Sequence, residues 1–121
     1  WDMIGMSLYP YWAMDGGFRD DAETTITDCI ENIRYVSGKF DCDVMIVETG
    51  FLVDESRPEV LEEGRRQLAR VIRESMNETC GRCKGVFYWE PECKPSQYKL
   101  GAFTEDGRPT VIMDAFSDWS E

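Results

Sequence analysis

Residues 44–50 read Val44-Met45-Ile46-Val47-Glu48-Thr49-Gly50, a continuous apolar run that is followed directly by a carboxylate. A strand without polar alternation is typical of a sheet covered on both faces, as parallel sheets are. The run therefore predicts a buried parallel strand over residues 44–47. Glu48 then lies at the carboxyl end of that strand, where parallel α/β proteins place their ligands. A carboxylate at this position is either an ordinary strand-end acid in solvent or a functional group.

Two further strand-like segments flank this run, at residues 3–9 and 85–89. A helical pattern lies between each pair of strands, and residues 13–21 read as a loop because they combine aspartates with a Gly-Gly pair. The alternation of strands and helices predicts an α/β fold built from βαβ units with a parallel sheet. At 121 residues, the chain is long enough for one domain with a core and too short for two.

The boundaries of the two helices can be predicted from their end signals. The first pattern is expected to end at Gly38 as a C′ residue, and its apolar positions recur at helical spacing: Ile26, Ile30, Ile33 and Val36. The second is expected to start with a capping box, in which Ser56 is the N-cap and Glu59 is at N3, and to run to about residue 77. After the third strand, a turn over residues 106–109 leads to a closing segment over residues 111–116.

The composition excludes several classes of function. The 24 acids exceed the 13 lysines and arginines and give a formal charge of −11, which favours neither nucleic acid nor an anionic membrane as a partner. The chain has no histidine, so it offers no Ser-His or Cys-His catalysis and no histidine-ligated metal. No apolar run approaches the roughly 18 residues of a membrane-spanning helix. We expect no cofactor and no metal.

Five cysteines are present, at positions 29, 42, 80, 83 and 93. Cys80 and Cys83 have the spacing of two zinc ligands, but the predicted strand after Cys83 would carry Cys93 roughly 20 Å away at about 3.3 Å per residue. One metal therefore cannot bind all three. A disulfide between Cys42 and Cys83, which both precede strands, and buried free thiols both stay open.

Aromatic and polar side chains gather where all three predicted strands end. The first strand leads into Tyr9, Tyr11 and Trp12, and the third ends in Tyr88, Trp89 and Glu90. Carboxyl ends of parallel strands share one rim, so these residues are expected to surround Glu48. Flat rings with hydroxyl and indole donors at their edges suit a pyranose, whose C–H face stacks while its hydroxyls need partners. The alternative is that half of the aromatic residues belong to the core, which we expect for Phe87 and which is also open for Tyr88.

At these residues the chain resembles glycoside hydrolase family 53, the arabinogalactan endo-β-1,4-galactanases. The motifs that carry the resemblance span almost the whole chain in order: Ile4-Gly5-Met6-Ser7-Leu8-Tyr9-Pro10-Tyr11-Trp12, Val44-Met45-Ile46-Val47-Glu48-Thr49-Gly50-Phe51, Gly85-Val86-Phe87-Tyr88-Trp89-Glu90-Pro91, Leu100-Gly101-Ala102-Phe103, Gly107-Arg108-Pro109-Thr110 and Asp114-Ala115-Phe116. Each motif alone is weakly specific, whereas their order and spacing together are specific. Leu8 departs from the pattern, because the family more often has an aromatic residue there.

The resemblance implies a (β/α)8 TIM barrel that hydrolyses glycosides with retention of configuration. It implies that residues 1–121 are a single partial domain, the C-terminal part of that barrel, with strands six to eight and helices six and seven. Glu48 would be the catalytic nucleophile on strand seven, and Tyr9 could donate its hydroxyl to Glu48 and keep the carboxylate ionised and oriented. Trp89 would stack under the sugar at the cleavage point. The candidates for flanking sugar contacts are Tyr11, Trp12 and Glu90.

The resemblance also implies a missing partner for Glu48. Retaining hydrolysis needs an acid/base carboxyl about 5–5.5 Å from the nucleophile. Glu90 is tempting, but in this clan of barrels the acid/base belongs at the end of strand four, which the chain does not contain. We therefore expect the fragment alone to be inactive on galactan or arabinogalactan, and to self-associate through the open edges of its sheet. The parent protein is expected to be secreted, periplasmic or on the cell surface.

Two other functions fit the same residues. The chain could be a non-catalytic carbohydrate-binding protein that has kept the aromatic rim. It could also come from another retaining β-glycanase of the same clan, and only the third-strand and closing motifs favour galactan over other glycans.

Overall fold

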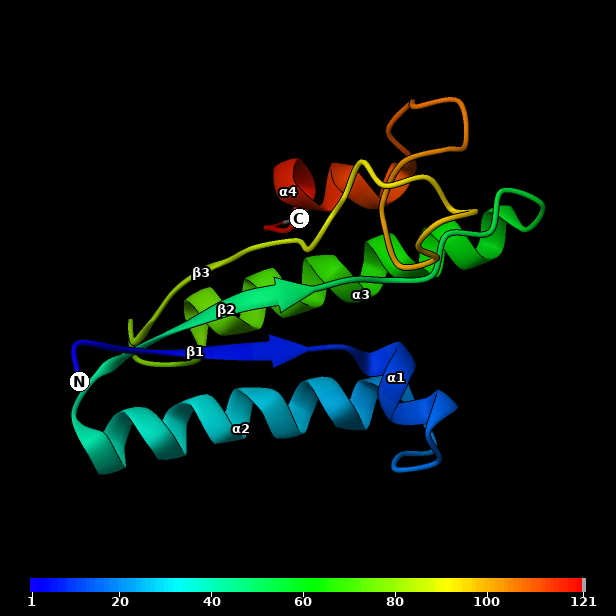
Figure 1. Ribbon diagram of the computed structural model, residues 1–121. Helices are drawn as coiled ribbons and strands as arrows, with labels where there is room; N and C mark the ends of the chain where they lie inside the picture. Colours follow the sequence, from blue (N-terminus) through cyan, green and yellow to red (C-terminus); the bar gives the residue numbers. More distant parts are fainter. Residues whose placement is uncertain (121) are drawn as a thin grey trace.

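The computed structural model of the chain describes residues 1–120 (Figure 1). Three strands form one parallel sheet in the order β1-β2-β3, and they are β1 (Met3–Leu8), β2 (Asp43–Thr49) and β3 (Cys83–Val86). The remaining elements are α1 (Pro10–Asp15), α2 (Ala22–Phe40), α3 (Pro58–Asn77), a 3-10 turn η1 (Val111–Asp114) and α4 (Ala115–Asp118). The predicted α/β class and the alternation of strands and helices are confirmed.

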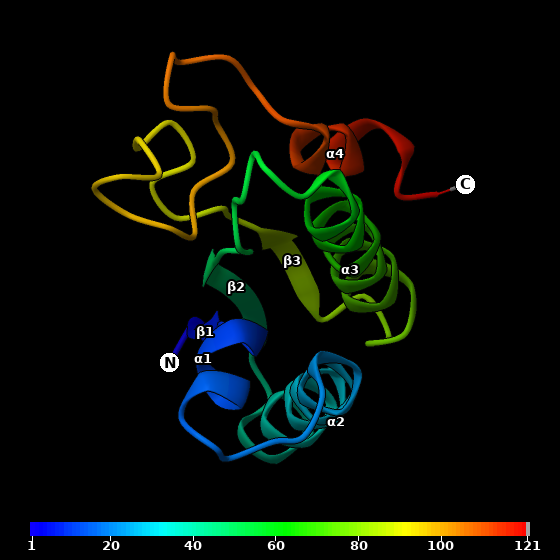
Figure 2. The same ribbon diagram turned by 90° about the vertical axis from the view of Figure 1, so that its right-hand side faces the viewer.

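Both long helices lie on the same side of the sheet (Figure 2). The core between the helices and the sheet is aliphatic, and α2, β2 and α3 each contribute two of its fully buried members: Ile26, Ile33, Val44, Ile46, Leu68 and Val71. Removing apolar surface from water contributes about 25 cal/mol per Å², so the burial of these side chains is the main stabilising interaction between the helices and the sheet. Arg66 on α3 also reaches Glu23 on α2, with 2.6 Å between Nη2 and Oε1.

The other side of the sheet is not covered by any helix of residues 1–120 (Figure 2). Val44 and Ile46 are fully buried against the helices, whereas 40% of Val47 and 45% of Met3 are exposed. The expectation that the strand at residues 44–47 is buried on both faces is therefore wrong for this chain. Phe87, expected in the core, is 58% exposed. The apolar composition of β2 matches a sheet with two covered faces, and the chain itself covers one.

Helix α2 is longer than its pattern predicts. Asp21 is the N-cap, and its carboxylate accepts a hydrogen bond from the backbone N–H of Thr24 at 2.6 Å. The helix passes through Gly38, and the left-handed residue that ends it is Asp41, with φ of 47°. Gly38 is exposed, and a glycine inside a helix costs only about 1 kcal/mol relative to alanine. The prediction that the helix ends at Gly38 is therefore wrong.

The predicted capping box at the start of α3 does not form. Arg57 is the N-cap of the helix and makes no side-chain cap hydrogen bond. Ser56 instead donates its backbone N–H and its hydroxyl to Oδ1 of Asp54, at 3.0 and 2.5 Å. Asp54 also accepts from Nε of Arg57 at 2.7 Å. A carboxylate two residues away thus competes successfully for the serine, as aspartates at turns often do.

Residues 10–15, which include part of the predicted loop, form the short helix α1. Pro10 occupies its first turn, where the missing proline N–H costs no hydrogen bond. Tyr11 and Trp12 therefore project from a helix directly beyond β1 rather than from the strand itself. The strand ends at Leu8, one residue before the predicted end. The tight turn from β1 into α1 keeps this short helix at the carboxyl edge of the sheet (Figure 1).

The C-terminal segment crosses back over α3 (Figure 1). The predicted turn is present: the backbone N–H of Thr104 donates to the carbonyl of Arg108 at 2.7 Å, and Gly107 has a φ of 85°. Residues 111–118 then form η1 and α4, where Asp118 pairs with Arg65 of α3 at 2.8 Å. Within residues 1–120, no helix has both the length and the apolar composition needed to cross a membrane.

All five cysteines are free thiols in the structure. Cys42 and Cys83 are buried, so a disulfide between them, one of the two possibilities left open by the sequence, is not present. Among residues 1–120, no group of cysteine and acidic side chains is arranged to hold a metal ion. Burial raises the pKa of the Cys29 thiol to about 11, with a smaller contribution from Cys83. That thiol is therefore protonated and unreactive at neutral pH.

Candidate active site

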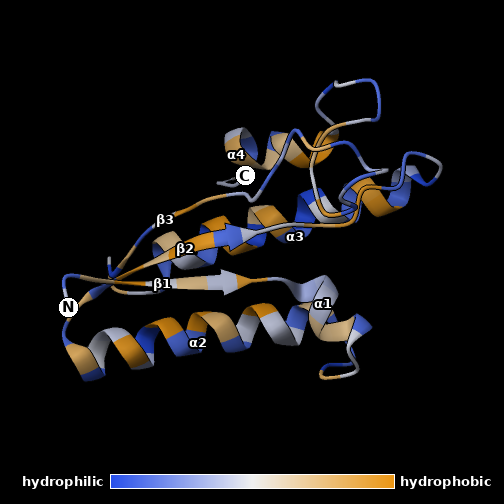
Figure 3. Ribbon diagram, viewed as in Figure 1, coloured by the Kyte–Doolittle hydropathy of each residue, from blue (hydrophilic) through white to orange (hydrophobic). Residues whose placement is uncertain are grey.

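Strand β2 changes from apolar to polar at its carboxyl end (Figure 3). Its register with β1 changes at the same point, because Met6 lies opposite Ile46 whereas Ser7 lies opposite Glu48. Val47 is thus an extra residue on β2, which makes a β-bulge. A bulge breaks the alternation of side chains along a strand, so the side chains after it point to the faces opposite to those expected.

The bulge decides which way Glu48 points. Val44 and Ile46 point toward the helices, and simple alternation would send Glu48 into the same core. With the bulge, Glu48 shares the uncovered face of the sheet with Ser7, and Thr49 returns to the core beside Leu8, where it is fully buried. Burying an unpaired carboxylate among aliphatic side chains would cost roughly several kcal/mol. The bulge avoids this cost by turning Glu48 away from the core.

Glu48 is held by the hydroxyl of Tyr9. Tyr9 Oη donates to Oε2 of Glu48 at 3.0 Å, which is the contact expected from the sequence. Burial raises the pKa of Tyr9 well above its usual value, and the bond to Glu48 and the neighbouring Tyr98 raise it further. Tyr9 therefore stays protonated and remains a donor. The pair consists of an oriented carboxylate and a fixed donor at the carboxyl edge of the sheet.

The loop after Glu48 is packed too tightly for any residue other than glycine at position 50. A Cβ on Gly50 would lie 2.6 Å from the carbonyl oxygen of Leu100. The hydroxyl of Tyr88 fixes the same region, because it donates to the carbonyl of Gly101 at 2.5 Å and accepts from the N–H of Phe51 at 2.9 Å. Residues 50–53, 88 and 99–101 thus form one hydrogen-bonded support for the loop that follows Glu48.

The partly buried Tyr88 in this support predicts a loss of stability in alkali. Burial is the main cause that raises the pKa of Tyr88, with a smaller contribution from Tyr98. The folded state therefore holds the Tyr88 proton where the unfolded state has lost it. The stabilisation is complete below the unfolded pKa of about 10 and falls by about 1.4 kcal/mol per pH unit above it. We expect urea unfolding from pH 9 to 11 to show a shallower decline in Tyr88→Phe, and equal slopes would contradict this.

The third strand end brings Trp89 and Glu90 to the rim. The N–H of Trp89 donates to the carbonyl of Thr49 at 2.9 Å, which anchors Trp89 beside the residue that follows Glu48. Trp89 is 46% exposed. Glu90 is exposed and has a φ of 49°. A left-handed conformation costs a residue with a Cβ roughly 1–2 kcal/mol, and such conformations cluster at functional sites. No hydrogen bond joins Glu90 to Glu48 within residues 1–120.

Tyr11 and Trp12 form a pair of rings farther out on the rim. Their centroids are 5.1 Å apart and their planes are at 80°, and Trp12 is 40% exposed. Lys99 joins them: its Nζ donates to Tyr11 Oη at 2.8 Å and lies 4.6 and 5.0 Å from the two ring centroids. The structure thus joins Tyr9 to Glu48, and it joins Tyr11 and Trp12 on α1 through Lys99.

Two residues of this rim, Tyr98 and Lys99, were not predicted from the sequence. Burial raises the pKa of Tyr98, the Tyr9 hydroxyl opposes that shift, and the charges of Glu48 and Glu90 add to it. Tyr98 therefore lies near both carboxylates. The segment reaches the site because Val53 N–H donates to the carbonyl of Lys99 at 2.9 Å. Gly50 was a sequence signal of this close approach, because a Cβ there would lie 2.6 Å from the carbonyl oxygen of Leu100.

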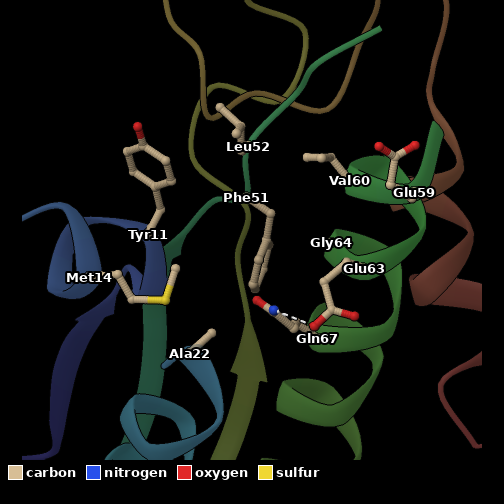
Figure 4. Close-up of a pocket in the computed structure, with 10 residues that line it drawn as sticks. All are labelled: Tyr11, Met14, Ala22, Phe51, Leu52, Glu59, Val60, Glu63, Gly64 and Gln67. Carbon is tan, nitrogen blue, oxygen red and sulfur yellow. Dashed lines mark hydrogen bonds between the residues drawn. The ribbon is translucent and has the colours of Figure 1, made fainter. Parts of the chain in front are cut away.

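An apolar pocket lies next to this rim but does not include Glu48 (Figure 4). It encloses about 260 Å³ between α1, α3 and the loop after β2. Its walls are mostly apolar, with Phe51 between Met14 on one side and Gly64 on the other, and with Glu63 bonded to Gln67 at its edge. The hydrogen-bonded pair of Tyr9 and Glu48 at the strand ends lies outside this pocket.

Comparisons with known proteins identify related chains. A model of glycosyl hydrolase family 53 matches residues 1–118. A fungal β-1,4-galactanase structure superposes with a TM-score of 0.70 at 16% identity, covering 98% of this chain and 38% of the galactanase. A β-glucuronidase of Faecalibacterium prausnitzii superposes with a TM-score of 0.62 at 17% identity, covering 98% of this chain and 22% of the glucuronidase. Xylanase 10B of Thermotoga petrophila superposes with a TM-score of 0.53 at 13% identity, covering 98% of this chain and 36% of the xylanase. The search of curated proteins gave no match.

At these identities the structural matches show the fold alone, which is that of TIM-barrel glycoside hydrolases. The chain spans 38% of the length of the galactanase that it matches. A parallel three-stranded sheet with helices on one side is a sector of such a barrel, in which the uncovered face looks toward the barrel axis.

Proposed function

The chain belongs to glycosyl hydrolase family 53, and from this membership we propose that it is the C-terminal part of a retaining endo-β-1,4-galactanase in which Glu48 is the nucleophile. In this proposal β1, β2 and β3 are strands six, seven and eight of the barrel, and α2 and α3 are helices six and seven. The observation that carries it is the Tyr9–Glu48 hydrogen bond of 3.0 Å, made at the bulge that directs Glu48 to the uncovered face.

Each residue has a distinct role in the proposed reaction. An oxygen of Glu48 attacks the anomeric carbon of a β-linked galactose, so a carboxylate–carbon bond forms while the bond to the leaving O4 breaks. An acid/base protonates that O4 and later removes a proton from the water that hydrolyses the intermediate. Tyr9 holds one Glu48 oxygen as a fixed donor, which leaves the other free to attack.

The acid/base is proposed to lie outside these residues, at the end of strand four of the barrel. Glu90 has the right charge, but its side chain is exposed and its backbone is left-handed. We assign Glu90 to substrate binding. Trp89, anchored beside Thr49, would stack under the sugar at the cleavage point, while Tyr11 and Trp12 contact sugars farther along the chain.

The substrate class can be tested with the complete protein. Purified enzyme should release galacto-oligosaccharides from β-1,4-galactan much faster than it releases sugars from xylan or β-1,4-glucan. Faster cleavage of xylan or glucan would favour another β-glycanase of the same clan. Binding of galactan with no cleavage of any glycan would favour a non-catalytic carbohydrate-binding protein. Because galactan is a polysaccharide and does not cross membranes, we also propose that the protein acts outside the cell, in the periplasm or on the cell surface.

Residues 1–121 alone are proposed to be inactive and to self-associate. Strands β1 and β3 each have one unpaired edge, and the uncovered face between them exposes Met3, Val47 and Phe87 by 45%, 40% and 58%. Unpaired edges beside exposed apolar side chains favour pairing with another chain. We expect sedimentation to show dimers or larger species and galactan assays to show no product. A compact monomer at high concentration would contradict the first expectation, and released galactose oligomers would contradict the second.

A further inference from the structure

A lysine placed on two aromatic rings marks a second binding position on the rim. We propose that Lys99, Trp12 and Tyr11 form a subsite that binds an acidic sugar, with the sugar's ring on Trp12 and its carboxylate on the Lys99 ammonium. The subsite flanks the cleavage point, so the inference rests on the proposed galactanase function. It adds a class of substrate, a galactan that carries a uronate or other carboxylated sugar beside the bond that is cut.

Lys99 has unused capacity to bind an anion. An ammonium has three N–H donors and no acceptor, and one donor is taken by the hydroxyl of Tyr11 at 2.8 Å. Among residues 1–120 no carboxylate lies within ion-pair distance of Lys99, although thirteen ion pairs involve other side chains. The Tyr11 oxygen and, more weakly, the Asp15 charge raise the pKa of Lys99, so it is cationic at any physiological pH.

Lys99 is a positively charged side chain in acidic surroundings. The chain has a formal charge of −11, and Glu48 and Glu90 both lie on the same rim. A neutral galactan needs no cation, and an acidic sugar would be repelled unless a positive group were placed where it binds. Lys99 is such a group, at a position where Trp12 offers a 40% exposed ring for the C–H face of a pyranose.

Lys99 is held at a fixed place relative to Glu48. Its carbonyl accepts from the N–H of Val53 at 2.9 Å, and its neighbour Leu100 packs against Gly50, two residues after the nucleophile. Its Nζ lies 4.6 and 5.0 Å from the centroids of Tyr11 and Trp12 on α1. These contacts restrict a side chain that would otherwise move freely, so less conformational entropy is lost when an anion binds.

The experiment compares three sugars on a complete protein with Glu48→Gln, which binds without cleavage. They are β-1,4-galactotetraose and two tetraoses oxidised at C6 to a carboxylate, one at each end. Calorimetry at low salt should show one acidic tetraose binding about threefold to fivefold more tightly than the neutral one, as an exposed ion pair allows. The preference should disappear in Lys99→Met, persist in Lys99→Arg, and shrink in about 0.5 M NaCl because salt screens the pair.

Lys94→Met is the matched control, because it removes the same charge from an exposed lysine of the same segment and should keep the preference. If neither acidic tetraose binds more tightly than the neutral one, or if Lys99→Met keeps the preference, the acidic subsite is overturned while the galactanase proposal stands. If the neutral tetraose is neither bound by Glu48→Gln nor cleaved by the unmodified protein, the proposed function fails instead.

Discussion

Replacing Glu48 by glutamine in the complete protein should lower kcat on β-1,4-galactan by a factor on the order of 10⁴ or more. Glutamine is nearly the same size as glutamate and can still face the hydroxyl of Tyr9, which lies 3.0 Å from Glu48 Oε2. It cannot, however, form the covalent ester with the anomeric carbon. Removing the nucleophile of a covalent mechanism costs about 10⁴- to 10⁶-fold in enzymes where it has been measured. The measurement is the rate of reducing-end release under saturating galactan.

Glu90→Gln is the matched comparison, because it makes the same chemical change one strand away. Glu90 is exposed and not bonded to Glu48, so we expect its loss mainly to raise KM, by about tenfold or less, as removal of one hydrogen bond to substrate would. A kcat loss in Glu90→Gln as large as that in Glu48→Gln would mean that the acid/base is Glu90 and lies inside this chain. A Glu48→Gln protein with near-normal kcat would remove Glu48 from the mechanism altogether.

Tyr9→Phe should lower kcat/KM on galactan by about 10- to 100-fold with little change in KM. Phenylalanine keeps the ring and removes only the hydroxyl that donates to Glu48. A hydrogen bond to a charged group contributes about 1.5–3 kcal/mol, and each 1.4 kcal/mol is tenfold in rate. Because Tyr9 acts through Glu48, the rate at which Glu48 is labelled by a 2-fluoro-galactosyl inactivator should fall by the same factor, whereas substrate affinity should not.

Tyr35→Phe controls for a general effect of removing a tyrosine hydroxyl. Tyr35 is 60% exposed on α2, and its hydroxyl accepts a hydrogen bond from Nζ of Lys39 at 3.0 Å. Its replacement should leave both rates unchanged. If Tyr9→Phe changed only the melting temperature, and not the rate of labelling, Tyr9 would be a residue of the fold and not a positioning residue for the nucleophile.

The order of strands and helices and the position of Glu48 were predictable from the sequence because they depend on local patterns. The apolar run at residues 44–47, with polar Glu48 after it, predicts a parallel strand and its functional end without any knowledge of distant contacts. The Tyr9–Glu48 contact was expected from the resemblance to family 53, and it is present. The strand and its end needed only the periodicity of a strand and the direction of the chain, whereas the face to which Glu48 points did not follow from them.

The bulge at Val47 could not be predicted in the same way, although it decides where Glu48 points. A bulge depends on how two strands pair, and no residue of β2 signals it on its own. The same limit explains the missed helix ends. Ser56 is a good N-cap in isolation, but Asp54 takes its donors, and Gly38 is a good terminator, but Asp41 ends the helix three residues later.

Lys99 and Tyr98 were missed because they reach the site through long-range packing. They lie some fifty residues after Glu48 in the chain, in a segment without helical or strand periodicity. Their place depends on Gly50, where a Cβ would meet the Leu100 carbonyl at 2.6 Å. The expectation that the strand at residues 44–47 is covered on both faces failed for a related reason, since the periodicity of a strand does not say what packs on its second face, and residues 1–120 place no helix there.

The most direct test of the central assignment is covalent labelling of the complete protein with a 2-fluoro-galactosyl inactivator, followed by peptide mass spectrometry. The fluorine slows hydrolysis of the intermediate, so the sugar stays attached to the nucleophile. We predict one equivalent of sugar on the peptide that contains Glu48, and loss of activity in step with the labelling. Sugar on Glu90 or on another carboxylate, or complete inactivation with Glu48 unlabelled, would contradict the assignment of Glu48 as the nucleophile.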